Sequence, residues 1–125
     1  MNIGFWHSQE NFNFQKDILD TPKEKMLGED PVFPLKHLFN KINSKYKIEF
    51  INLNRINDYD ILIFFNFPIS QKLVNFIKED KRPKYLICAE APTIDTNTWN
   101  ENNHKYFKKI FTWDDDVIDN KKYFK

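Results

Sequence analysis

Two short apolar segments constrain the fold of this 125-residue chain more than any other feature. The first is Ile61-Leu62-Ile63-Phe64-Phe65, and the second is Tyr85-Leu86-Ile87-Cys88, which follows Lys84. A strand that faces water on one side alternates apolar and polar residues, whereas a strand covered on both sides is apolar throughout. Both segments therefore predict buried strands of a parallel sheet, at residues 60–65 and 84–88.

Three further segments have the composition of strands. They are rich in apolar, aromatic and β-branched residues, and they comprise residues 3–6, 47–53 and 109–112. Residues 8–30 are polar and contain Pro22 and Gly28, so we expect a long loop there.

Helical spacing of apolar residues appears between these strands. A first helix is predicted from Asp30, an N-cap followed by proline, to about Ser44. A second is predicted between Ser70 and Pro83, and a short third around residues 100–107. The apolar positions are Leu35, Leu38, Phe39 and Ile42 in the first helix, and Leu73, Val74, Phe76 and Ile77 in the second.

The order of these elements predicts the fold class. Strands and helices alternate along most of the chain, which is typical of an α/β fold with a mostly parallel sheet between two layers of helices. We therefore expect one Rossmann-like, three-layer domain that spans residues 1–125.

Composition excludes several classes of function. The 19 basic and 18 acidic residues nearly cancel, so the chain as a whole has no field to attract nucleic acid. Only Gly4 and Gly28 are glycines, so neither a dinucleotide-binding loop nor a P-loop can be formed, and we expect no cofactor. The lone Cys88 allows no internal disulfide, which favours a reducing cytoplasm. No secretion signal and no transmembrane segment are predicted.

Other candidate chemical groups have weaker patterns. His7, His37 and His104 do not have the spacing of metal ligands, so we predict no metal site. Cys88 lies inside an apolar run, where a thiol is usually a small hydrophobic residue and not a nucleophile. The acidic run 114–116 follows a predicted strand and favours a solvated turn or the N-terminus of a helix.

Glu90 is the acid whose position most needs an explanation. It ends the apolar segment that begins at Leu86, and Pro92 follows two residues later. In open α/β sheets, the carboxyl ends of strands deliver side chains into the crevice where ligands bind. Two interpretations remain open from the residues alone. Glu90 either has a structural role, as a cap of a nearby helix or as an acceptor of backbone N–H bonds, or acts as a general base.

Several motifs in the second half of the chain resemble a known family. They are Leu86-Ile87-Cys88-Ala89-Glu90-Ala91-Pro92, the run 103–107, the run 109–115 with Trp113, and the run 119–124, preceded by 58–66. Together they resemble the N-terminal half of bacterial glycosyltransferase family 10, the α-1,3/4-fucosyltransferases. Residues 1–50 share only the fold pattern.

This resemblance implies a GT-B architecture, in which two Rossmann-like domains face each other across a cleft. The N-terminal domain of the family binds the acceptor sugar, and a carboxylate there deprotonates the attacking hydroxyl in an inverting reaction. Glu90 matches that carboxylate. Five residues are predicted to line the acceptor cleft because they lie at predicted strand ends or in the loops that follow: Trp6, His7, Asn66, Trp99 and His104.

The chain departs from the family pattern at Lys125, where the family continues into the domain that binds GDP-fucose. The resemblance therefore implies that GDP-fucose binds a donor domain outside this chain, either separately encoded or lost, and that the chain alone is inactive. The complete enzyme would act in the cytoplasm, at the periphery of the inner membrane, on a glycan acceptor.

Two alternatives to this function stay open. One is a non-catalytic α/β binding or interaction module, or a gene relic. The other is a receiver-like or flavodoxin-like domain. A receiver needs an acidic cluster after its first strand, and here Trp6-His7-Ser8 occupies that position.

Overall fold

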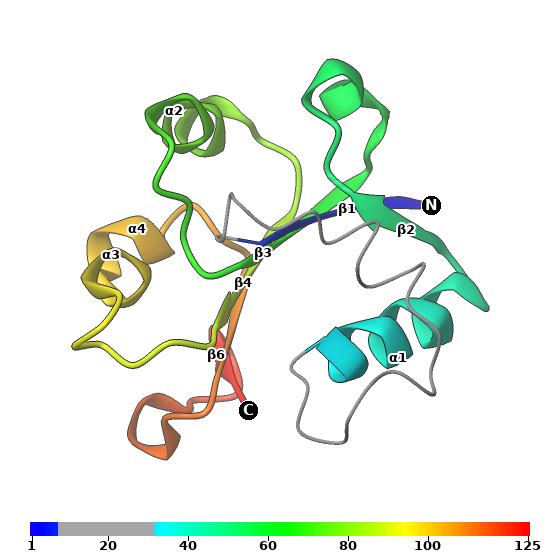
Figure 1. The fold of residues 1–125 in the computed structure, drawn as a ribbon. Helices are drawn as coiled ribbons and strands as arrows, with labels where there is room; N and C mark the ends of the chain where they lie inside the picture. Colours follow the sequence, from blue (N-terminus) through cyan, green and yellow to red (C-terminus); the bar gives the residue numbers. More distant parts are fainter. Residues whose placement is uncertain (8–31) are drawn as a thin grey trace.

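The computed structural model describes residues 1–7 and 32–125 and contains one six-stranded parallel sheet (Figure 1). The strands lie in the order β2-β1-β3-β4-β5-β6, and every neighbouring pair is parallel. The predicted loop at 8–30 and the helix start at Asp30 lie outside the described residues. The α/β class with a parallel sheet is confirmed.

The elements have the following bounds. The strands are β1 (Asn2–His7), β2 (Lys47–Phe50), β3 (Ile61–Phe65), β4 (Lys84–Cys88), β5 (Lys109–Thr112) and β6 (Tyr123–Phe124). Among the described residues, the α-helices are α1 (Val32–Asn43), α2 (Gln71–Glu79), α3 (Thr96–Trp99) and α4 (Glu101–His104), and the 3₁₀ helices are η3 (Leu53–Asp58) and η4 (Asp115–Val117).

Helices cover the sheet from two sides. In Figure 1, α1 lies on one face, and α2, α3 and α4 lie on the other. This arrangement follows from the apolar strands, because β3 and β4 carry apolar side chains on both faces. Parallel strands also require crossover connections, and helices α1 and α2 supply two of them.

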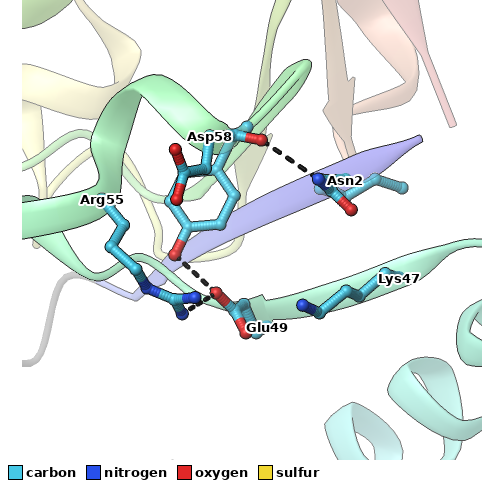
Figure 2. Close-up of a pocket in the computed structure, with 7 residues that line it drawn as sticks. Asn2, Lys47, Glu49, Arg55 and Asp58 are labelled. Atoms are coloured by element: carbon cyan, nitrogen blue, oxygen red, sulfur yellow. Dashed lines mark hydrogen bonds and ion pairs between the residues drawn. The ribbon is translucent and has the colours of Figure 1, made fainter.

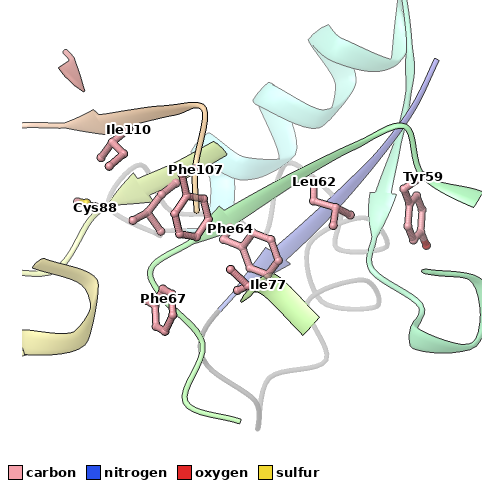
Figure 3. Packing of buried hydrophobic residues seen from close by; sticks show 9 residues of the cluster. Tyr59, Leu62, Phe64, Phe67, Ile77, Cys88, Phe107 and Ile110 are labelled. Carbon is pink, nitrogen blue, oxygen red and sulfur yellow. The ribbon is translucent and has the colours of Figure 1, made fainter. Parts of the chain in front are cut away.

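The larger core cluster lies between the sheet and α2 (Figure 3). Leu62, Phe64 and Leu86 from the strands and Ile77 from α2 are fully buried at 0 % exposure. The ring of Phe107 meets the ring of Phe64 edge to face, with centroids 5.9 Å apart. Complete burial of such side chains stabilises the fold by about 1.5–3 kcal/mol each.

The second core cluster lies under α1 and combines phenylalanine with isoleucine side chains. Phe39 of α1 is fully buried, and its ring packs edge to face on Phe5, with centroids 5.1 Å apart. It also packs on Phe50 of β2 at 5.0 Å. These three rings are among the thirteen phenylalanines of the chain, and each fills a large volume between helix and sheet.

Gly4 is required by packing and not by phosphate binding. A Cβ atom at this position would lie 2.9 Å from Cγ1 of Ile51 and 3.0 Å from side-chain atoms of both Tyr59 and Leu62. Residues of three neighbouring segments therefore close on the backbone of β1, and only glycine leaves room for them.

Most boundaries agree with the sequence predictions, and β2 is a clear exception. It ends at Phe50 and not at Leu53, because Asn52 begins the helix η3. The Asn52 side chain accepts a hydrogen bond from the backbone N–H of Asn54 at 3.0 Å, as an N-cap does.

Three further features differ from the sequence predictions. The expected helix around 100–107 corresponds to α4 and ends at His104, and the short helix α3 that precedes it was not predicted. The short strand β6 was not predicted, since two residues carry no periodic signal. Leu38 is exposed although its spacing placed it on the apolar face of α1, because Phe39 takes the buried position.

Candidate functional site

The strand order defines where a site is expected. The chain leaves β1 for β2 on one side, while β3, β4 and β5 follow on the other. The crevice of a doubly wound sheet opens at such a reversal, above the carboxyl ends of the two central strands. Here those ends carry His7 on β1 and Asn66 directly after β3, and the two strands are paired up to His7 and Phe65.

Asn66 joins β3 to the loop that follows β4. Its backbone has a φ of 62°, in the left-handed region that asparagine tolerates better than most residues. Its side chain is 1 % exposed, and Oδ1 accepts the backbone N–H of Ala89 at 2.8 Å and of Glu90 at 3.3 Å. Asn66 therefore fixes the start of the loop that carries Glu90.

Glu90 is held by its backbone on both sides. Its N–H donates to Asn66, and its carbonyl oxygen accepts the indole Nε1–H of Trp99 at 2.6 Å. The residue is half-buried, and within residues 1–7 and 32–125 its carboxylate makes no hydrogen bond or ion pair.

Asp95, and not Glu90, caps the following helix. The carboxylate of Asp95 accepts the backbone N–H of Thr98 at 3.0 Å and its hydroxyl at 2.6 Å, which is the geometry of an N-cap of α3. The capping interpretation of Glu90 is therefore wrong for α3. Asp is among the residue types preferred at the N-cap, so Asp95 is a signal that could have shown this in the sequence.

His7 lies at the end of β1 with its ring stacked on Phe65, with ring centroids 4.7 Å apart and an angle of 18° between planes. Burial lowers the pKa of His7 from its usual 6.5 to about 4. The imidazole is therefore neutral at pH 7, and one ring nitrogen donates while the other accepts.

Trp6 precedes His7 and projects from the opposite face of the sheet, where it packs against the larger core cluster. Its indole Nε1 is buried, and no partner for it exists among the described residues. A buried indole N–H usually has a hydrogen-bond partner, and within residues 1–7 and 32–125 this atom has none.

Trp99 and His104 form a second group, over β4 and β5. With Cys88 and other residues they line a hollow of about 120 Å³. The ring of Trp99 packs edge to face against Trp113, with centroids 5.6 Å apart, and the Trp113 side chain is 54 % exposed.

His104 is buried and its ring nitrogens both have partners. Nε2 lies 2.7 Å from the carbonyl oxygen of Thr98, and Nδ1 lies 3.0 Å from the hydroxyl of Tyr123. A carbonyl can only accept, so Nε2 carries a proton. These bonds tie α3 and α4 to the edge strand β6.

The structure thus divides the predicted site residues into two groups. His7, Asn66 and Glu90 lie at the carboxyl ends of β1, β3 and β4, and Trp99 connects this group to His104 through the Glu90 carbonyl. Asn66 and His104 use polar atoms for internal bonds. That any of these residues binds an acceptor sugar stays a prediction.

Cys88 is a core residue. It is 2 % exposed, and burial is the main cause that raises the pKa of its thiol to about 12, with the nearby Asp95 carboxylate adding to the effect. The group is thus a thiol at neutral pH and not a thiolate nucleophile. Within the described ranges, no cluster of three His, Cys, Asp or Glu side chains could hold a metal ion.

A hollow that sequence reasoning missed lies at the amino ends of β1 and β2 (Figure 2). It measures about 280 Å³. Glu49 accepts a hydrogen bond from the Tyr59 hydroxyl at 2.9 Å and forms an ion pair with Arg55. Burial is the main cause that raises the pKa of Tyr59. Nothing in the spacing of these residues signals that they meet, because the contact depends on how η3 turns the chain back towards β2.

Comparisons with known proteins identify no family. The chain matches no protein-family model, and it matches neither a curated protein nor a solved structure. In the described part of the chain, no helix has the length and apolar character to cross a membrane. Function must therefore be argued from the geometry of the chain itself.

Proposed function

We propose that this chain is the acceptor-binding half of a fucosyltransferase-like glycosyltransferase, with Glu90 as its general base. The observation that carries the proposal is the state of the Glu90 carboxylate. Its backbone is fixed by Asn66 and Trp99, while its side chain takes part in no hydrogen bond or ion pair within the described residues. A general base needs this combination of fixed position and available lone pairs.

Aromatic side chains beside Glu90 supply surfaces for a sugar ring. Trp99 is bonded to the Glu90 carbonyl, and the exposed ring of Trp113 packs against Trp99. The apolar face of a sugar stacks on such rings, while polar groups orient its hydroxyls. The neutral imidazole of His7 is a polar group at the same edge of the sheet.

The proposed reaction uses one proton transfer in this chain. Glu90 takes the proton of the acceptor hydroxyl as that oxygen attacks the anomeric carbon of GDP-fucose. The bond from that carbon to GDP breaks, GDP leaves with the electron pair, and the configuration inverts. We place the nucleotide on a donor domain outside the described residues, because the family resemblance implies such a domain and the two glycines of the chain allow no glycine-rich phosphate loop. The proposal includes a cytoplasmic reaction, peripheral to the inner membrane in the complete enzyme.

A non-catalytic binding module is the second candidate. The observation that favours it is the hollow beside Glu49, Arg55 and Tyr59, which lies at the edge of the sheet opposite Glu90. Binding of a ligand in that hollow would need no catalytic residue. The two candidate functions can be distinguished because only the first requires Glu90.

Reconstitution of transfer tests the proposal. The chain is combined with the donor domain of an α-1,3/4-fucosyltransferase, fused or in trans, and release of GDP is measured with a panel of oligosaccharide acceptors. Glu90→Gln should lower turnover by about 10²–10⁴-fold, the usual contribution of a general base. Glu79→Gln, the same substitution at an exposed site on α2, should leave turnover unchanged. Equal turnover of the two variants would remove Glu90 from the mechanism.

A further inference from the structure

A basic hollow lies between the end of α2 and the segment that follows α4, at the amino ends of β4 and β5. It measures about 470 Å³, within the range of small-molecule sites. Six of its twelve lining residues are Lys or Arg, and two are acidic. The whole chain has a net charge of only +1, so positive charge is concentrated at this place.

The floor of the hollow is fixed by internal bonds. The guanidinium of Arg82 meets the carboxylate of Asp80 with two Nε contacts of 3.0 and 2.9 Å, and it also donates to the carbonyl of Tyr59 at 2.9 Å. Lys84 is 3 % exposed and donates to the carbonyls of Asp80 and Arg82. The carboxylate of Asp80 is thus paired with Arg82 and Lys84 within the floor, and two backbone carbonyls of the segment after α2 are already hydrogen-bonded.

The rim carries the charges that remain available. Lys78, Lys81, Lys105 and Lys108 are all exposed, and none forms an ion pair with another described residue. The ammonium of Lys105 lies 5.2 Å from the centre of the Tyr106 ring, which keeps it at the rim by a cation–π contact. The remaining acid, Glu79, is a single opposing charge.

We propose that this hollow binds a compact ligand that carries two or more phosphate groups. Four ammonium groups around one concave space can contact several phosphate oxygens at once, and lysine binds phosphate as a point charge. A nucleic acid would instead require cations along an extended track. The hollow lies at the amino edge of the sheet, whereas Glu90 lies at the carboxyl edge, so this inference is independent of the proposed function.

Calorimetry with tripolyphosphate at low ionic strength tests the inference directly. We expect one binding event per chain. Substitution of the four rim lysines by glutamine, K78Q/K81Q/K105Q/K108Q, should weaken the affinity at least tenfold. A matched variant, K41Q/K45Q/K72Q/K121Q, removes the same charge from exposed lysines elsewhere and should stay within twofold of the native chain. Circular dichroism of both variants shows that the fold is retained.

Further arms identify the source of the phosphate. Vesicles of phosphatidylcholine with a phosphatidylinositol bisphosphate present phosphate groups on a lipid. Binding to these vesicles without binding of tripolyphosphate assigns the site to a lipid headgroup. Binding of tripolyphosphate alone assigns it to a soluble ligand. Four outcomes would overturn the inference. They are an equal loss of affinity in both lysine variants, tighter binding of citrate than of tripolyphosphate, tighter binding of a single-stranded oligonucleotide that displaces tripolyphosphate, and no binding of either tripolyphosphate or vesicles.

Discussion

Asn66 should contribute several kcal/mol to the free energy of unfolding, because its side-chain oxygen fixes the loop that carries Glu90. In Asn66→Ala, the N–H groups of Ala89 and Glu90 lose their acceptor. An unsatisfied buried donor costs about 1–3 kcal/mol, and the longer bond belongs at the low end of that range. Alanine in the left-handed region adds about 1 kcal/mol, so we expect a total loss of about 3–4 kcal/mol.

Asn120 provides a matched control for backbone strain. Its φ is 56°, close to that of Asn66, but it is exposed, and the bond it makes to Tyr123 comes from its backbone N–H. Asn120→Ala should therefore cost only the conformational part, about 1 kcal/mol. Asn66→Gly should recover about that much relative to Asn66→Ala, because glycine adopts positive φ freely.

Urea unfolding followed by circular dichroism measures these differences. The native chain and the Asn66 and Asn120 variants are compared at pH 7, and the shift in midpoint gives the change in free energy of unfolding. Equal losses in Asn66→Ala and Asn120→Ala would refute the reasoning. The Oδ1 bonds would then carry no energy, and Asn66 would not be the residue that positions Glu90.

Two further predictions concern pH and capping. His7 is neutral in the folded chain down to a pKa of about 4, while the unfolded chain takes up a proton near pH 6.5, so stability should fall as pH drops between these values. The loss should reach about 2 kcal/mol after allowance for partial exposure, and His7→Gln should abolish that part of the slope, which a persisting slope would contradict. Asp95→Ala should lower the free energy of unfolding by about 1–2 kcal/mol through loss of the α3 cap, whereas Glu90→Ala should change it by less than about 0.5 kcal/mol. The reverse order in urea unfolding would return the capping role to Glu90.

The sequence predicted the central strands well because a strand buried on both faces is a continuous run of apolar residues. The apolar runs at 61–65 and 84–88 are β3 and β4, and the helices between Ser70 and Pro83 and up to about Ser44 are α2 and α1. Helix and strand periods are local properties, so they can be read from consecutive residues.

The order of the strands and the contacts within the site could not be predicted from local sequence patterns. The meeting of Asn66 with Glu90 spans 24 residues and depends on the pairing of β3 with β4. The sequence singled out both residues, but it could not show that Asn66 uses its oxygen internally. The Glu49–Tyr59 contact was missed because it depends on where η3 directs the chain.

The central claim is that Glu90 belongs to an acceptor site and not to a nucleotide site. The chain has three tryptophans, so its ¹H–¹⁵N spectrum holds three indole signals, and those of Trp99 and Trp113 report on the surroundings of Glu90. Titration with the panel of oligosaccharides should shift the Trp99 and Trp113 signals in a saturable manner, and GDP-fucose alone should leave them in place. Saturable shifts of these two signals with GDP-fucose, and none with any oligosaccharide, would contradict the account.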